Sequence, residues 1–299
     1  MKPKHQGGYT RRHTDFCERT LFTLMRGLGP WKKSVYLVGG LVPRYLIGHA
    51  HVGTSDVDLV LDLQLLSGID AYRTLEQNLK ALGFERNRNE EGAVQHFSWK
   101  KAVEDGLSVT VDLLCPDWEQ MPGRAKPVPG NQRLSALRIP GAHLVMRDFL
   151  EVSLEVELLN EQGLAKESIR VANTTAFIVL KTLAYEDRVE EKDAYDLVYC
   201  LLHGPGGPEG IGQVFRQRLV DWPEEVLLQR CIEILRERFG DTRRDGPTSY
   251  ARFQVDPGQQ ERIALLRQEA YGAVSAFLEA LSDSGPVNSG ADIDIKSPD

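Results

Sequence analysis

Residues 35–62 constrain the fold more strongly than any other part of the chain. A short apolar run, Ser34–Val38, leads into them and predicts a buried strand, and Gly39 and Gly40 follow it directly. Glycines let a ligand approach the backbone closely, and the N–H groups at the start of a following helix favour phosphate. The pattern therefore predicts a strand, a tight turn, a short helix and a second strand over 57–63.

Paired acidic residues open that second strand. Asp56 and Asp58 are two positions apart, so on a strand their carboxylates point the same way. A further acid, Asp112, stands inside the β-branched run 108–114, where it stays charged only in a solvated or metal-bound setting. A DxD pair alone is more often a solvated face or a loop cap. Beside a phosphate cradle, however, three carboxylates suit Mg²⁺ and predict phosphoryl or nucleotidyl transfer.

A second charged cluster lies in residues 177–202, within a segment whose pattern predicts one long helix over 174–202. Successive members are seven, four and four positions apart and would share a helix face: Lys181, Arg188, Lys192 and Asp196. The alternative is a solvated face with ordinary ion pairs. The apolar neighbours of Lys181 count against a solvated face. They place the stem of Lys181 near apolar surface, where its charge needs a carboxylate or a ligand phosphate as partner.

The rest of the pattern predicts an α+β fold: a mixed, twisted sheet with helices over residues 1–172, then a helical bundle over 173–283. The active site should lie in the groove between them. Residues 1–12 are polar and predicted to be loose, and Thr14 is predicted to cap the first helix. The stretch 116–130 is predicted to be a loop. The Ser/Gly/Asp-rich tail, 284–299, is predicted to be disordered. Further predicted helices cover 67–82, 214–220, 224–239 and 259–281, and further strands 94–99, 107–114 and 152–158.

Composition narrows the class of protein. The 299 residues, 41% of them hydrophobic, suffice for one large domain or two ordinary ones. A net charge of -7 counts against a generally basic nucleic-acid-binding protein but leaves room for a local basic face. The four cysteines form no CxxC pair and the histidines no metal-ligand spacing. No apolar run reaches the roughly 18 residues that span a bilayer, so we expect a soluble cytoplasmic protein with no membrane partner.

These motifs resemble known families. The Gly-Gly turn, the Asp-x-Asp and the later Asp resemble the signature of the nucleotidyltransferase superfamily, which includes DNA polymerase beta and the CCA-adding enzymes. Residues 38–48 are similar to the CCA-adding version, although Tyr45 stands where that version carries Asp. Residues 177–202 resemble the helix that follows the core in AbiEii-type and MenT-type toxins. Those toxins typically show Gly-Ser or Lys-Gly-Gly at the turn, where this chain has Val38-Gly39-Gly40.

The resemblance implies a Mg²⁺-dependent (or Mn²⁺-dependent) nucleotidyltransferase. It would transfer NMP from a nucleoside triphosphate (NTP) to a hydroxyl of RNA, such as a tRNA 3′ end, or of a protein. It would act as the toxin of a toxin–antitoxin or phage-defence pair, with a cognate antitoxin. The implied catalytic residues are Asp56, Asp58, Asp112 and Lys181, and the three aspartates would hold the metal. The implied nucleotide-binding residues are Gly39, Gly40, Arg44, Ser55, Lys181, Arg188, Asp193 and Asp196.

Several alternatives stay open. Asp193 or Asp196 would orient Lys181 or touch the substrate. Arg44 would contact phosphate or pair with an acid, and the hydroxyl of Ser55 would contact phosphate or cap the strand. For the whole protein, one alternative is a small-molecule, antibiotic-type nucleotidyltransferase. The other is a non-catalytic nucleotide-binding interaction protein, against which the intact set of acids argues.

Overall fold

The computed structural model describes residues 5–48, 51–64, 69–104, 106–118, 121–128, 131–255 and 259–282. Its strands are β1 Val35–Val38, β2 Asp56–Leu61, β3 Glu85–Arg88, β4 Val94–Glu104, β5 Leu107–Pro116, β6 Ala125–Val128, β7 Asn131–Ile139, β8 Phe149–Glu157 and β9 Leu164–Ala172. Its α-helices are α1 Arg11–Leu28, α2 Pro43–Leu46, α3 Ile69–Ala81, α4 Thr174–Arg188, α5 Glu191–His203, α6 Gly207–Asp221, α7 Val226–Phe239, α8 Asp245–Gln254 and α9 Gln260–Ala280. The predicted tail, 284–299, lies outside these ranges.

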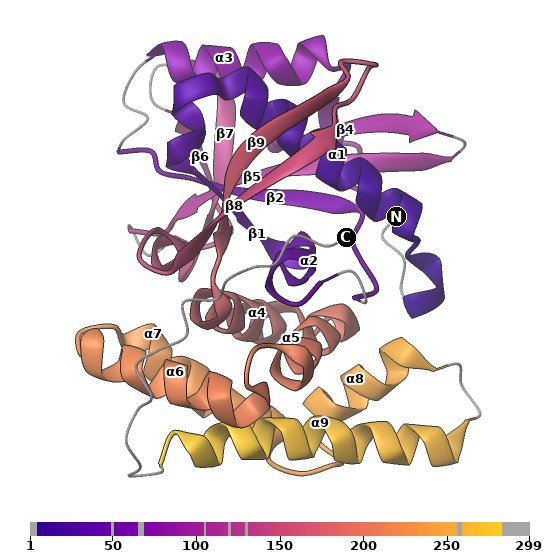
Figure 1. Ribbon diagram of the computed structural model, residues 1–299, viewed down its shortest axis with the longest axis vertical. Coiled ribbons are helices and arrows are strands. Elements are labelled where there is room, and N and C mark those ends of the chain that lie inside the picture. The colour runs from indigo at the N-terminus through magenta and orange to yellow at the C-terminus, as the bar shows by residue number, and fades with distance from the viewer. Residues whose placement is uncertain are drawn as a thin grey trace.

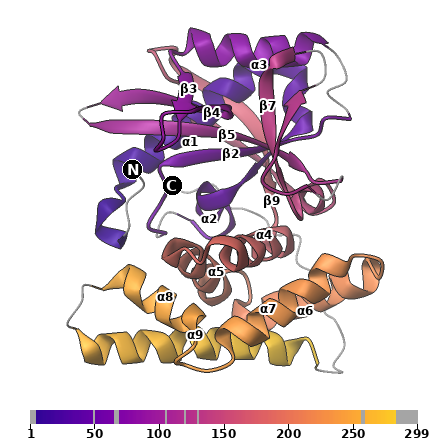
Figure 2. The ribbon, with the colours of Figure 1, turned by 180° about the vertical axis from the view of Figure 1, so that it is seen from behind.

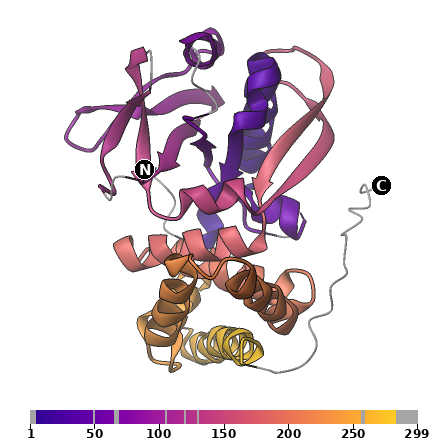
Figure 3. The same ribbon diagram turned by 90° about the vertical axis from the view of Figure 1, so that its left-hand side faces the viewer.

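The strands form one mixed sheet, and the helices α4–α9 lie together on one side of it (Figure 1). Its order is β3-β4-β5-β2-β1-β9-β8, with β7 beside β5 and β6 beside β7. The central pair β2 and β5 runs parallel, whereas β1 and β2 are antiparallel. From the side, the C-terminal helices form a separate layer below the sheet (Figure 3). The predicted α+β class, with a mixed sheet followed by helices, is confirmed.

Helix α1 packs against the central strands and holds the chain that leads into β2. Its buried face includes Phe16, Leu21 and Leu24, and it contacts β2, β5, β9 and α3. Seen from behind, α3 lies close to β7, which it contacts (Figure 2). The predicted cap at Thr14 is wrong, because Thr10 caps the helix by accepting the His13 N–H at 3.1 Å. The segment 1–12, predicted to be loose, therefore includes the helix start and a 3₁₀ turn, η1 Gln6–Gly8.

The single helix predicted over 174–202 is two helices, α4 and α5. Val189 ends α4 in the left-handed conformation, with φ 52 and ψ 38, and extended Glu190 then occupies the N-cap position of α5 without a side-chain cap. Neither glycine nor proline marks this turn, which is why the residue pattern did not predict it. The turn folds α5 back beside α4, so acidic residues of α5 face basic residues of α4.

Several other elements were not predicted. Strands β6 and β7 occupy part of the predicted loop 116–130 and the residues after it, and β3, β9 and α8 carried no clear pattern. The Gly/Pro stretch after α5 begins a helix, because Pro208 lies in the first turn of α6, where its missing N–H costs nothing.

All four cysteines are free and buried. In the described part of the chain, no helix is both long and apolar enough to cross a bilayer.

Candidate active site

A small cavity of about 40 Å³ lies where the sheet meets the helical layer. That volume has room for a few waters or one phosphate-sized group. The sheet side contributes two carboxylates, and the helical side contributes three basic side chains and two further carboxylates. The lining residues are Tyr9, Gly40, Thr54, Asp56, Asp58, Lys181, Arg188, Glu190, Lys192 and Asp193. The two clusters that the sequence singled out therefore meet around one cavity.

The aspartates come from two neighbouring strands. Asp58 on β2 lies directly opposite Asp112 on the parallel strand β5, and Asp56 precedes it by two residues on the same face. Parallel strands lie about 4.8 Å apart, so the three side chains leave the sheet close together. Asp56 is buried, and Ser55 Oγ donates a hydrogen bond to its Oδ1 at 3.3 Å. Ser55 therefore supports a carboxylate rather than lining the cavity.

The glycine turn makes room for side chains of the site. Gly39 has φ +75, and a β-carbon there would lie 1.9 Å from Asp58 Oδ2. A β-carbon on Gly40 would lie 2.9 Å from Thr54 Oγ1 and 3.2 Å from Lys192 Nζ. Of the two glycines assigned to the triphosphate, Gly40 lines the cavity, whereas the space at Gly39 holds the Asp58 carboxylate.

We expect Gly39→Ala to destabilise the fold and displace Asp58. The alanine would have an unfavourable positive φ, and its β-carbon would clash with the Asp58 carboxylate. Gly29→Ala is the matched control: Gly29 has φ +56, and nothing lies within 4 Å of its added β-carbon. The control should lose less unfolding free energy than Gly39→Ala, because alanine at position 29 has an unfavourable positive φ but no clash to relieve. Urea unfolding of both variants checks this, and equal losses would contradict the contact between Gly39 and Asp58.

A buried ion network stands behind the helical wall. Lys181 Nζ lies 2.9 Å from Asp193 Oδ1 and 2.6 Å from Asp196 Oδ2. Arg188 donates to Asp193 through Nε at 2.7 Å and through a second N–H at 2.9 Å. Lys192 Nζ donates to Asp196 Oδ1 at 2.7 Å. Two carboxylates thus hold three cations at the cavity wall.

The network holds Asp196 and Lys181 in their charged forms. Burial alone would raise the pKa of Asp196, but Lys181 and Lys192 hold that pKa well below its ordinary value. Burial likewise lowers the pKa of Lys181, but Asp193 and Asp196 outweigh it and raise the pKa above its ordinary value. Asp196 is fully buried and lies behind the cavity rather than on its wall. Of the alternatives for Asp196, the geometry is that of a residue that orients Lys181.

His51 connects this network to the loop before β2, a role that residue spacing did not suggest. Its Nε2 lies 2.9 Å from Asp196 Oδ1, and its Nδ1 accepts the Gly53 N–H at 3.1 Å. These partners place the ring hydrogen on Nε2 and make the imidazole neutral. Burial lowers the pKa of His51 in spite of the Asp196 carboxylate. The rings of Tyr195 and Tyr199 pack around it, at 5.4 and 5.0 Å between centroids.

The pKa of His51 is lower in the folded chain than in the unfolded chain, so as the pH falls the unfolded chain takes up a proton before the folded chain does. The free energy of unfolding therefore decreases as the pH is lowered. The loss starts near the unfolded pKa of about 6.5 and grows as the pH falls towards the folded value. H51Q keeps an N–H donor for Asp196 and should flatten this slope; H51A should also lose stability at neutral pH. Urea unfolding between about pH 5 and 7.5 measures both. An unchanged slope in H51Q would contradict a neutral, buried His51.

Arg44 lies away from the cavity. Its guanidinium contacts Asp15 Oδ1 at 2.8 Å and Glu18 Oε1 at 3.0 Å, both on α1. Tyr45 donates its hydroxyl to the same Glu18 at 3.0 Å. The arrangement is that of the acid-pairing alternative, and it attaches α2 to α1.

The carboxylates of the cavity wall suit a metal ion that arrives bound to a phosphate-containing ligand. Among the residues that the structure describes, no three His, Cys, Asp or Glu side chains come close enough together to hold a metal ion by themselves. Mg²⁺, however, commonly binds through one or two carboxylates, with phosphate oxygens and water completing its shell. Asp56 and Asp58 on the cavity wall fit that pattern, with Asp112 beside Asp58.

Comparison with known proteins gives little similarity. No family model and no curated protein matches the chain. One solved structure, an antigenic nucleotidyltransferase-like protein from Paracoccidioides brasiliensis, is similar at 16% identity with a TM-score of 0.34. The match covers 74% of this chain and 94% of that one. A likeness of this size identifies neither a family nor a function.

Proposed function

We propose that this protein is a metal-dependent nucleotidyltransferase that transfers NMP from an NTP to a hydroxyl acceptor. One observation carries the proposal: Asp56 and Asp58, of which Asp58 is in register with Asp112, line one phosphate-sized cavity together with Lys181, Arg188 and Lys192. A merely solvated strand face would not place two carboxylates against three buried or half-buried cations.

The charges on the cavity wall argue for a divalent cation. Phosphate oxygens beside Asp56 and Asp58 would be repelled unless a cation stood between them. Mg²⁺ bound there would polarise the phosphoryl oxygens and stabilise the attacking and leaving oxygens. On the opposite wall, the Arg188 side chain is 44% exposed and donates to phosphate oxygens that enter from solvent. The ammonium of Lys181, fixed by Asp193 and Asp196, contributes positive charge beneath them.

The proposed reaction is a single displacement. The acceptor hydroxyl forms a bond to the α-phosphorus, the bond from that phosphorus to the β-phosphate oxygen breaks, and pyrophosphate leaves with its electron pair. Asp112, beside Asp58, accepts the hydroxyl proton directly or through a water. The cations of the helical wall stabilise the charge that develops on the leaving pyrophosphate.

The acceptor and the biological role rest on the sequence resemblance to AbiEii-type and MenT-type toxins. On that basis the acceptor is RNA, with a tRNA 3′ end as the first choice and a protein hydroxyl as the second. The protein would be the toxin of a cytoplasmic toxin–antitoxin or phage-defence pair. Growth inhibition on induced expression, relieved by the Asp58→Asn substitution, is the expected result.

The test of the enzymatic proposal uses the full chain with each of four α-labelled NTPs, MgCl₂ and total cellular RNA. We expect label in a discrete RNA band, and its loss when EDTA replaces MgCl₂. Label in protein, or in an added aminoglycoside, would keep the transferase and change the acceptor. A folded chain that binds NTP but transfers nothing to any acceptor would instead be the non-catalytic binding protein.

A further inference from the structure

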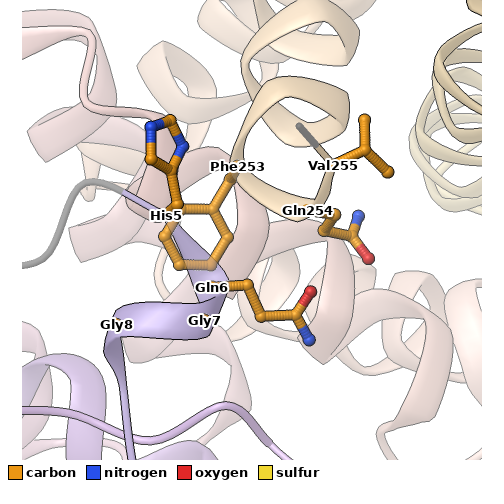
Figure 4. Close-up of a pocket in the computed structure, with 7 residues that line it drawn as sticks. All are labelled: His5, Gln6, Gly7, Gly8, Phe253, Gln254 and Val255. Carbon is orange, nitrogen blue, oxygen red and sulfur yellow. The ribbon is translucent and has the colours of Figure 1, made fainter. Parts of the chain in front are cut away.

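A larger cavity, of about 520 Å³, lies between the N-terminal segment and the end of α8. Its lining comes from His5–Gly8 and from Phe253–Val255 (Figure 4). The volume falls within the roughly 300–1,000 Å³ that small-molecule sites occupy. The cavity is therefore large enough for a ligand that the phosphate-sized cavity is too small to hold.

Tyr9 separates the two cavities. It follows Gly8 directly in the chain and itself lines the small cavity. The centroid of the Tyr9 ring lies 6.0 Å from that of the Phe253 ring. Lys192 Nζ lies 5.2 Å from the centroid of the Tyr9 ring. One side chain thus contacts a wall residue of each cavity, which makes the two neighbours.

The lining of the larger cavity differs in chemistry from that of the small one. Among its lining residues that the structure describes there is no Asp, Glu, Lys or Arg side chain, whereas the small cavity is lined mainly by charged side chains. The carboxamides of Gln6 and Gln254 lie to the same side of the Phe253 ring in Figure 4. Each carboxamide can both donate and accept hydrogen bonds, and that of Gln254 already donates one N–H to the Tyr250 carbonyl at 3.3 Å. A β-carbon added at Gly7 would meet nothing within 4 Å, so the backbone there is open. Such a lining suits an uncharged polar group with donors and acceptors.

We propose that the larger cavity binds the base and ribose of the NTP, and that one phosphate group of the same NTP enters the small cavity. This inference rests on the proposed function. The charged cavity takes a phosphate group, the neutral cavity takes the nucleoside, and Tyr9 lies between them. Gln6 and Gln254 would read the edge of the base, as carboxamides do in nucleic-acid recognition. The terminal nucleoside of an acceptor RNA has the same chemistry. The test below distinguishes binding of the NTP nucleoside from binding of the acceptor nucleoside.

The test compares two ligands by calorimetric titration of the full chain with Mg²⁺: each NTP, and inorganic tripolyphosphate, which has no nucleoside. We expect the preferred NTP to bind more tightly than tripolyphosphate. The double variant Gln6→Ala/Gln254→Ala should bind that NTP about tenfold more weakly, because two hydrogen bonds are lost, and tripolyphosphate with unchanged affinity. Gln213→Ala, exposed on α6, is the control and should change neither affinity.

The outcomes separate the two proposals. Equal affinities for NTP and tripolyphosphate, or an unchanged NTP affinity in the double variant, would overturn the nucleoside cavity and leave the transferase standing. A double variant that weakens acceptor RNA but not NTP would assign the cavity to the acceptor and overturn the inference. Failure of both NTP and tripolyphosphate to bind would overturn the transferase, and the nucleoside cavity with it.

Discussion

Asp58→Asn should lower nucleotide transfer by at least about a hundredfold while the protein stays folded. Asparagine keeps the shape of the side chain against Gly39 but removes a negative charge from the cavity wall. A metal ion that polarises a phosphoryl oxygen lowers the activation barrier by several kcal/mol, and each 1.36 kcal/mol is about tenfold in rate. Transfer of α-labelled NMP under saturating NTP and Mg²⁺ measures the loss.

The matched control for this variant is Asp62→Asn. Asp62 directly follows β2, and its Oδ1 accepts the Gln64 N–H at 3.0 Å, away from the cavity. This variant should transfer nucleotide at nearly the rate of the unmodified chain. If Asp58→Asn retained more than about a tenth of that rate, metal binding through Asp58 would be wrong.

Asp196→Asn should lower the free energy of unfolding by about 3–5 kcal/mol. The carboxylate is fully buried, and Lys181, Lys192 and His51 all contact it. Removing one partner of a buried ion pair leaves uncompensated charge in a low-dielectric setting, which costs about that amount. Urea unfolding at neutral pH, followed by circular dichroism, measures the difference.

A second variant tests the charge explanation for Asp196. In Asp196→Asn/Lys192→Met one of the uncompensated cations is also removed, so part of the lost stability should return. If instead the two losses simply add, the cost of Asp196→Asn comes from packing. A single variant within about 1 kcal/mol of the unmodified chain would show that the network contributes little.

The segment around the paired aspartates could be predicted because each of its signals is local. A buried strand, two glycines and acids two positions apart fix the order of elements and the face on which the carboxylates lie. The proximity of Asp112 also followed, since a lone acid in a β-branched run needs polar neighbours. The spacing did not predict which group lies against Gly39. In the structure that group is the carboxylate of Asp58.

The helical side was predicted for a reason that proved incomplete. Lys181, Arg188 and Asp196 were expected on one face of one helix, but they gather because the chain reverses at Val189. That turn has no glycine or proline, so tertiary packing overrides the local preference. The positions of Tyr9 and His51 depend on contacts between residues far apart in the chain, which a single sequence does not reveal.

The division of the cavity wall between the sheet and the later helices has a consequence for synthesis of the chain. A growing polypeptide that ends before α4 carries Asp56, Asp58 and Asp112 but none of Lys181, Arg188 and Lys192. Such a nascent chain has the acids without the cations that would face them, and it lacks Asp196, the partner of His51. The complete cavity wall therefore forms only after α5 has left the ribosome and docked beside α4.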